Sequence, residues 1–245
     1  MQGRSLLVSD LDGTLLGDDA ATQRFGDWFR RQGHDLWLVY ASGRFYSSVV
    51  QSIRTTALPE PNAVIGGVGT DIRLHPSGRP AAAWHQRLQR AWDARRVAAT
   101  LEDEQDLRPQ PNEFQSAYKV SYYLDGAGPD RIELIRRELL SRGVVADLIY
   151  SSNRDLDVVP AGTNKGTAAA FLAAMWGIPP RRVMVSGDSG NDLAMFQAGF
   201  RGIVPANAHA ELKALNGPDD YHATLPYAAG VMEGVRHWMA EAEPI

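Results

Sequence analysis

A short apolar run that ends in two carboxylates constrains this sequence more than any other feature. Residues 5–16 read SLLVSDLDGTLL, and Asp10 and Asp12 would repel each other at neutral pH unless a third group held them together. The apolar run predicts a buried strand. Similar runs alternate with helical spacing in the first and last thirds of the chain, which predicts a parallel sheet with helices on both faces. Ligands bind such sheets beyond the carboxyl ends of the strands, so we expect a ligand site at the two carboxylates.

The middle of the chain departs from this rhythm. An arginine-rich helix is predicted around residues 84–104, and residues 117–125, AYKVSYYLD, alternate like a strand with one solvated face. A further helix and further strands follow. We therefore predict an α/β protein with a core domain of residues 1–80 and 161–245, and a small α+β domain of residues 81–160 inserted into it.

Composition excludes several classes of function. With 44% hydrophobic and 22% charged residues the chain is typical of a globular protein. A net charge of −4 gives no general attraction for nucleic acid or anionic membranes, and a chain without cysteine has no disulfide or thiolate chemistry. The N-terminus lacks the layout of a signal peptide, and the most apolar helical stretch, residues 167–178, is shorter than the roughly 20 residues that cross a bilayer. We expect a cytoplasmic protein that binds neither nucleic acid nor membranes.

A second acidic cluster follows another predicted strand. Asp188 in SGDSGND, residues 186–192, ends its strand as Asp10 ends the first, and Asn191 and Asp192 open the next helix. Each aspartate taken alone fits a turn or a helix cap. Taken together at one edge of a sheet, they form a set of oxygen ligands of the kind that Mg²⁺ prefers.

Two further motifs indicate a phosphate site. Ser42 in LVYASGR ends the second apolar run, and a hydroxyl next to Gly43 with its exposed backbone amide makes an anion cradle. Lys165 in GTNKG lies at the start of a predicted helix, where the helix dipole disfavours a cation. A bound phosphate would reverse that penalty, although Lys165 taken alone fits a solvated surface lysine equally well.

In this order and spacing, DLDGT, ASGR, NKG and GDSGND resemble the four motifs of the haloacid-dehalogenase (HAD) superfamily of phosphohydrolases. The insertion between the second and third motifs resembles the superfamily's type II (Cof-like, IIB) cap. More narrowly, GVGTDI, YKVSYYLD and YSSNRDLDVVPAGTNKG resemble sucrose-phosphate phosphatases and related disaccharide-phosphate phosphatases. The resemblance implies a Rossmann-like parallel-sheet core with an inserted cap. Relatives usually carry Thr where this chain has Ser42, and both supply a hydroxyl.

The resemblance also implies roles for the motif residues. Asp10 is the expected nucleophile, which forms an aspartyl-phosphate, and Asp12 is the expected general acid and then base. Mg²⁺ is expected at Asp10, the Asp12 backbone carbonyl and Asp188, with support from Asp192. The expected phosphate contacts are Ser42, Gly43, Lys165 and Asn191.

Substrate choice is expected in the cap. Residues that could hydrogen-bond sugar hydroxyls are Lys119, Asn153 and Asp155 in the cap, and Thr70 and Asp71 in the core. The substrate that we expect is sucrose 6-phosphate. Mannosylfructose phosphate, or another phosphorylated compatible solute, stays open because a few contacts decide such differences. A non-catalytic phosphosugar sensor and a phosphomutase are the remaining alternatives. We expect a monomer, and association with an upstream sugar-phosphate synthase stays open.

Overall fold

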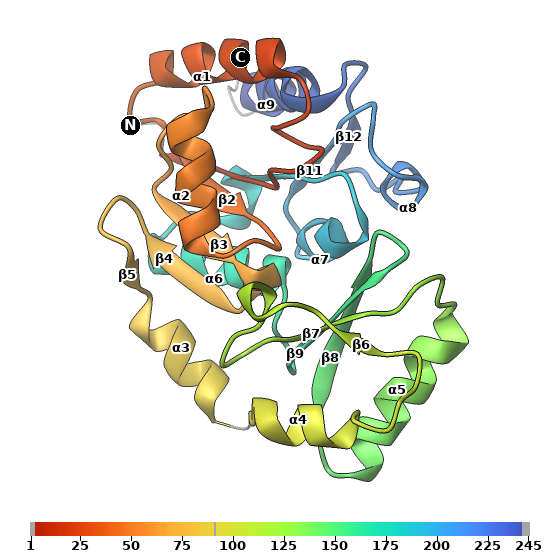
Figure 1. Ribbon diagram of the computed structural model, residues 1–245. Coiled ribbons are helices and arrows are strands. Elements are labelled where there is room, and N and C mark those ends of the chain that lie inside the picture. Colours follow the sequence, from red (N-terminus) through yellow and green to blue (C-terminus); the bar gives the residue numbers. More distant parts are fainter. Residues whose placement is uncertain (1–2, 91, 242–245) are drawn as a thin grey trace.

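The computed structural model describes residues 3–90 and 92–241, so residues 1, 2, 91 and 242–245 of the predicted domains lie outside the described residues. The described chain forms two sheets that lie side by side (Figure 1). The larger sheet has eight strands in the order β12 (Asp220–His222), β11 (Arg201–Val204), β10 (Val183–Ser186), β1 (Ser5–Ser9), β2 (Leu36–Ala41), β3 (Ala63–Gly66), β4 (Asp71–Leu74) and β5 (Arg79–Pro80).

The first strand of the chain lies in the middle of the larger sheet. β1 pairs in parallel with β10 on one side and with β2 on the other, and the strands from β12 to β3 are all parallel. Among the described strands of the larger sheet, antiparallel pairing is confined to one edge, where β4 pairs with β3 and β5 pairs with β4. The apolar run therefore forms a strand that is buried on both faces, as a central parallel strand must be.

Alternate side chains of β1 face two hydrophobic clusters. Leu7 packs in one cluster with the helices α1 (Asp19–Arg31), α2 (Tyr46–Thr55) and α9 (Tyr227–Glu241). Leu6 and Val8 pack in the other cluster with the helices α3 (Ala82–Gln89), α6 (Lys165–Met175), α7 (Leu193–Phe196) and α8 (Ala210–Lys213). Figure 1 shows α1 and α9 together on one side of the sheet. The predicted parallel sheet with helices on both faces is confirmed.

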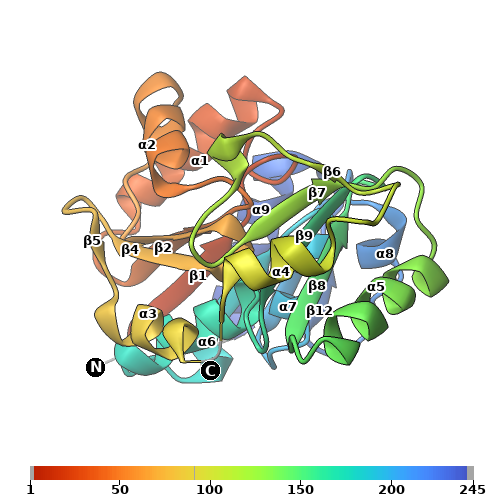
Figure 2. The same ribbon diagram turned by 60° about the horizontal axis from the view of Figure 1, so that its bottom comes forward.

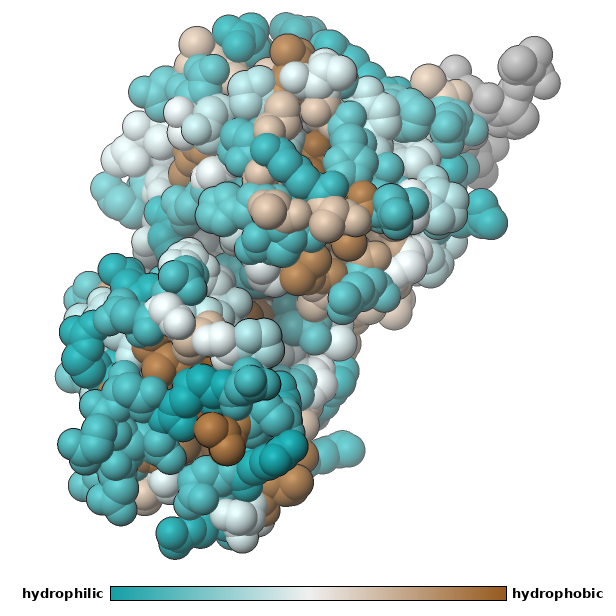
Figure 3. Space-filling model, turned by 90° about the vertical axis from the view of Figure 1, so that its right-hand side faces the viewer, coloured by the Kyte–Doolittle hydropathy of each residue, from teal (hydrophilic) through white to brown (hydrophobic). Residues whose placement is uncertain are grey.

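The smaller sheet is antiparallel and belongs to the inserted segment, which we call the cap. Its strand order is β6 (Arg108–Pro109), β7 (Val120–Tyr123), β9 (Asp155–Pro160) and β8 (Ala146–Ser151). The helices α4 (Ala94–Thr100) and α5 (Pro129–Ser141) cover one face of it (Figure 2) and share a separate hydrophobic cluster with its strands. Figure 3 shows the two parts as two lobes with a largely hydrophilic surface.

The predicted helix of residues 84–104 is wrong in its extent. Two shorter helices occupy this stretch, because Asp93 caps α4 by accepting hydrogen bonds from the backbone amides of Arg95 and Arg96. Trp84 on α3 is fully buried in a cluster of the larger sheet, whereas Trp92 packs against the cluster of the cap. The domain boundaries at residues 80/81 and 160/161 stay predictions.

The described helices were compared with the length and hydrophobicity of a membrane-spanning helix. Within residues 3–90 and 92–241, no helix combines the length and the apolar character that crossing a bilayer requires.

Candidate active site

Three neighbouring parallel strands deliver the motif residues to one edge of the larger sheet. Asp10 follows β1, Ser42 follows β2, and Asp188 lies two residues beyond β10. The chain after β1 stays tied to β10, since the Asp10 amide donates to the Ser186 carbonyl at 2.9 Å. All three side chains are nearly inaccessible to solvent. The strand order alone therefore brings together residues that are far apart in the sequence.

Lys165 is the cation of this cluster and is not a surface residue. Its side chain is fully buried at the start of α6, and its Nζ donates to Asp10 Oδ1 at 2.8 Å and to Asp192 Oδ1 at 2.7 Å. Its third donor bond goes to Asn191 Oδ1 at 2.7 Å. Burial alone would lower the pKa of Lys165, but the charges of Asp10 and Asp192 outweigh it and raise the pKa. Since all three donors are occupied, a contact to phosphate needs one of these bonds to be exchanged.

The aspartates have the spacing of a metal site. Asp10, Asp188 and Asp192 each offer a carboxylate oxygen, and these oxygens lie within 4.8 Å of one another. Burial, helped by the charge of Asp10, raises the pKa of Asp188 to about 6. Burial also raises the pKa of Asp192, although Lys165 opposes it. Buried carboxylates that ionise with such difficulty favour a divalent cation among them, so the donor set fits a metal ion.

Asp192 has less freedom to ligate than its neighbours. Its Oδ2 accepts from the backbone amides of Asp188 and Ser189 at 3.0 and 3.2 Å, while its Oδ1 is held by Lys165. Among residues 3–90 and 92–241, the Asp188 carboxylate accepts one side-chain hydrogen bond, from Thr14 Oγ1 at 3.1 Å. Asp192 therefore shapes the turn after β10 and supports the other two carboxylates.

Gly13 makes room for this cluster. Its φ of +82° lies in the left-handed region, and a Cβ at this position would overlap the carboxylate of Asp188. Asn207 Nδ2 donates to the Gly13 carbonyl at 2.7 Å and fixes the turn. The glycine of the DLDGT motif is thus required by the close approach of the first and fourth motifs.

A cavity of about 320 Å³ separates the motif residues from the cap. The core contributes most of the predicted phosphate and metal residues to its lining: Asp10, Asp12, Ser42, Gly43, Asp188 and Asn191. The cap contributes polar and aromatic side chains: Gln110, Phe114, Lys119, Tyr123, Ser151, Ser152, Arg154, Asp155 and Asp157. With a cation among the carboxylates, the core end suits an anionic group, and the cap end suits a ligand rich in hydroxyl groups.

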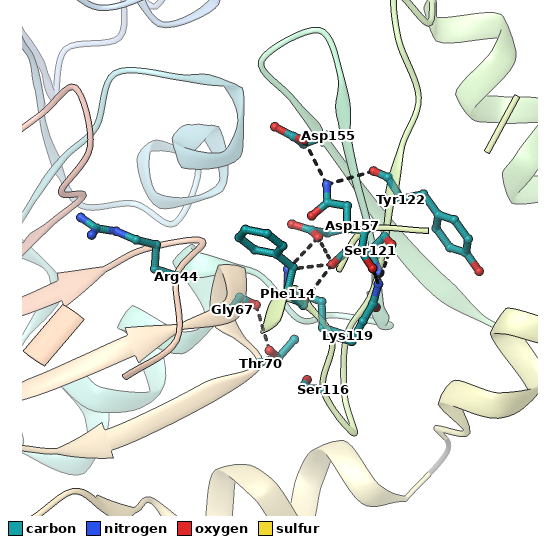
Figure 4. Close-up of polar contacts among 12 residues, drawn as sticks. Arg44, Gly67, Thr70, Phe114, Ser116, Lys119, Ser121, Tyr122, Asp155 and Asp157 are labelled. Atoms are coloured by element: carbon teal, nitrogen blue, oxygen red, sulfur yellow. Dashed lines mark hydrogen bonds and ion pairs between the residues drawn. The ribbon is translucent and has the colours of Figure 1, made fainter. Parts of the chain in front are cut away.

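The cap side of the cavity is an ordered polar network (Figure 4). Lys119 Nζ donates to Asp157 Oδ1 and to Ser121 Oγ, both at 2.8 Å, and Ser121 Oγ donates to Asp157 at 2.5 Å. These side chains alternate with Val120 and Tyr122, which face the hydrophobic cluster of the cap. The alternation predicted for residues 117–125 is confirmed, but the polar face is buried in the cleft and is not solvated.

Three of the predicted sugar contacts lie elsewhere. Thr70 is buried and donates to the Gly67 carbonyl at 2.9 Å. Asp71 forms ion pairs with Arg73 and His85, and together with Thr70 it lines a separate cavity of about 620 Å³ between β4, α3 and the cap. Asn153 is exposed at the tip of the β8–β9 hairpin and is absent from the lining of the 320 Å³ cavity.

Sequence reasoning also missed cavity residues that local signals could have indicated. Asp157 lies two residues after Asp155 in β9, so a period of two places both on the cleft face. Arg44 stands within the ASGR motif itself. Gln110 and His209 reach the cavity from segments without a distinctive pattern, and only the tertiary fold reveals them.

Comparison with known proteins assigns the family. A family model described as sucrose-6F-phosphate phosphohydrolase matches residues 3–239. The chain belongs to this family. Membership in the sucrose-6F-phosphate phosphohydrolase family confirms the resemblance that the motifs indicate, and it confirms the class of enzyme as a phosphatase.

Individual relatives cover almost the whole chain. A mannosylfructose-phosphate phosphatase of Agrobacterium fabrum is 37% identical over 243 residues, which are 97% of this chain and 98% of that protein. The crystal structure of the sucrose-phosphatase from Synechocystis sp. PCC6803, in complex with sucrose and phosphate, superposes with a TM-score of 0.90 at 30% identity and covers 97% of this chain and 98% of that one. A HAD subclass IIB sugar phosphatase has a TM-score of 0.67 at 15% identity, covers 97% and 98% of the two chains, and supports the predicted fold.

Proposed function

We propose that this chain is a Mg²⁺-dependent phosphatase that removes the phosphate from a disaccharide phosphate, with sucrose 6-phosphate as the substrate. One observation carries the proposal: a single cavity joins the buried carboxylates after β1 and β10 to the polar network of the cap. The first part suits a phosphoryl group and the second suits sugar hydroxyls. Family membership supports the same reading.

The core residues would perform the displacement in two steps. In the first, Asp10 attacks phosphorus, the bond from phosphorus to the sugar oxygen breaks, and Asp12 gives its proton to that oxygen. In the second, Asp12 takes a proton from water as the water attacks phosphorus and releases Asp10 and phosphate. Partial desolvation between the walls of the cleft, opposed in part by Arg44, raises the pKa of Asp12, which favours the protonated form that the first step needs.

The buried aspartates supply the ligands for the metal. Asp10, Asp188 and the backbone carbonyl of Asp12 would hold Mg²⁺, with Asp192 as support. When bound, Mg²⁺ neutralises charge on the phosphoryl group. Ser42, the Gly43 amide, Asn191 and Lys165 are the groups at this edge that could take the remaining phosphoryl oxygens.

The cap network would recognise the sugar. Lys119 and Asp157 are a buried donor and a buried acceptor that line the cavity opposite Asp10, and Asp155 lies beside them on the same face of β9. A sugar can replace some of their mutual hydrogen bonds with bonds to its hydroxyls. A ligand that offers both donors and acceptors would therefore bind more tightly, because it leaves no buried polar group unpaired.

A second candidate substrate keeps the same chemistry. Mannosylfructose phosphate is favoured by the relative from Agrobacterium fabrum, which is named for that substrate and is 37% identical. Both substrates present a phosphate and a hydroxyl-rich disaccharide to the same cavity. The monomeric state, association with a synthase and the cytoplasmic location stay predictions.

The substitution Lys119→Met tests the sugar contact. We expect kcat/KM for the disaccharide phosphate to fall about tenfold or more, because one charge-assisted hydrogen bond contributes about 1.5–3 kcal/mol, while turnover of p-nitrophenyl phosphate changes much less. Lys213→Met is the matched control, since Lys213 is exposed on α8. Thermal unfolding of each variant shows whether it is folded. Equal losses on both substrates would assign Lys119 a structural role only.

A further inference from the structure

Arg44 forms an ion pair with Asp12 at the edge of the active-site cavity. Its Nη2 donates to Asp12 Oδ1 at 2.9 Å, and its Nε lies 2.8 Å from Asp12 Oδ2. Both side chains line the cavity next to Asp10. The pair connects the first and second motifs through one charge-assisted hydrogen bond, from Nη2, and one close charge contact, at Nε.

The Asp12 carboxylate has no other support among residues 3–90 and 92–241. No second side chain and no backbone amide in this part of the chain hydrogen-bonds to it, and its side chain is 62% exposed. A carboxylate in this position would turn freely without the guanidinium. Its orientation matters, because an acid or base has to lie within hydrogen-bonding distance of the proton that it transfers.

Hydrogen bonds to two serines of the core fix Arg44 in place. Its Nη1 donates to Ser52 Oγ on α2 at 2.9 Å, and its backbone amide donates to Ser42 Oγ at 3.1 Å. Figure 4 shows the Arg44 side chain on the core side of the cleft, directed away from the Lys119 cluster of the cap. The guanidinium is therefore anchored within the core, by α2 and by the second motif.

We propose that Arg44 is a positioning residue, which acts through Asp12 and holds the acid/base carboxylate at the angle needed for proton transfer to the sugar oxygen. A carboxylate has about four lone-pair sites. The hydrogen bond from Nη2 occupies one lone-pair site, on Oδ1, and the remaining sites stay available to the leaving group or to water. This inference rests on the proposed function, because it assigns Arg44 to the step in which the sugar leaves.

The rival role for Arg44 is direct binding of the substrate phosphate. The two roles differ in their dependence on the leaving group. A sugar alkoxide needs a proton to leave, whereas p-nitrophenolate leaves without one. Since kcat/KM reports only the steps up to the first irreversible one, it isolates the departure of the leaving group from the later hydrolysis of the aspartyl-phosphate.

The experiment compares wild type, Arg44→Ala, Arg44→Lys, Asp12→Ala and the double variant on sucrose 6-phosphate and p-nitrophenyl phosphate with Mg²⁺. We expect Arg44→Ala to lower kcat/KM for the sugar phosphate about 100-fold, the lower end of what general acid–base catalysis contributes, and to change the value for p-nitrophenyl phosphate less than threefold. Arg44→Lys should resemble Arg44→Ala, because one ammonium group cannot keep the hydrogen bonds of the guanidinium to both Asp12 and Ser52. The double variant should be no slower than Asp12→Ala.

Control variants distinguish loss of the positioning role from misfolding and from failure of the proposed phosphatase function. Arg30→Ala removes an exposed arginine–aspartate pair on α1 and should leave both substrates unaffected. Ser52→Ala frees Nη1 without removing the pair, so a smaller loss confined to the sugar phosphate is expected even if Arg44→Ala folds poorly. Equal losses on both substrates, or additive losses in the double variant, would overturn the positioning role. Absence of phosphate release by wild type would instead contradict the proposed function.

Discussion

Asp188→Asn should make the metal-free protein more stable while it removes one ligand of the proposed metal site. Burial and the nearby charge of Asp10 raise the pKa of Asp188 from its ordinary value of 3.8 to about 6. One pH unit corresponds to about 1.4 kcal/mol, so keeping Asp188 ionised above pH 6 costs the native state about 3 kcal/mol. The amide removes this charge and keeps an oxygen that can accept the hydrogen bond from Thr14.

The sign follows from the protons bound in each state. Between about pH 4 and pH 6 the native protein keeps the proton of Asp188 while the unfolded chain has lost it. The contribution of Asp188 to the free energy of unfolding therefore falls as the pH rises through this range, and it stays low above it. The difference between Asp188→Asn and wild type should be near zero at pH 4 and largest at pH 8.

Thermal unfolding in EDTA measures this difference. At pH 8 we expect Asp188→Asn to gain about 1–3 kcal/mol, since the new amide donors offset part of the benefit, and each kcal/mol raises the melting temperature by about 2–4 °C in a chain of this size. Mg²⁺ should stabilise wild type and leave the variant unchanged. Asp219→Asn, an exposed substitution, is the control. A variant no more stable than wild type at pH 8, or a gain that is the same at pH 4, would refute the reasoning.

Two further substitutions test the buried cluster. Lys165→Met leaves Asp10 and Asp192 buried without their cation. We expect the free energy of unfolding, measured by chemical denaturation at pH 8, to fall by about 3–5 kcal/mol, and phosphate release to be lost. The fall in stability should be smaller at pH 5, where Asp192 with its raised pKa takes up a proton. Gly13→Ala forces a side chain into the left-handed region and against the Asp188 carboxylate, and should cost about 1–3 kcal/mol and lower the affinity for Mg²⁺ measured by calorimetry. Unchanged stability in either variant would contradict the packing described for these residues.

The site residues that directly follow a strand could be predicted from the sequence. Asp10, Ser42 and Asp188 each follow an apolar run, and parallel strands bring their carboxyl ends to one edge, so a local pattern was enough to place them together. The motif order then indicated the family. Polar alternation in β7 likewise predicted which side chains share a face of the cap sheet.

Other features depend on packing that no local pattern encodes. The burial of Lys165 and Lys119 follows from carboxylates that arrive from distant strands. Asp71 is held in a different cavity by His85, and His85 is placed there by a helix that begins near residue 82. The capping role of Asp93, which divides the predicted long helix, was readable in principle, since an aspartate before a helical stretch is a common N-cap.

Phosphate release by wild type and by Asp10→Asn tests the central claim most directly. The assay would use sucrose 6-phosphate, mannosylfructose phosphate, fructose 6-phosphate and p-nitrophenyl phosphate, each with Mg²⁺ and with EDTA. The account predicts Mg²⁺-dependent release with a strong preference for one disaccharide phosphate, and no release by the folded Asp10→Asn variant. Release that persists in Asp10→Asn, or tight binding of a disaccharide phosphate by wild type without any release, would contradict it.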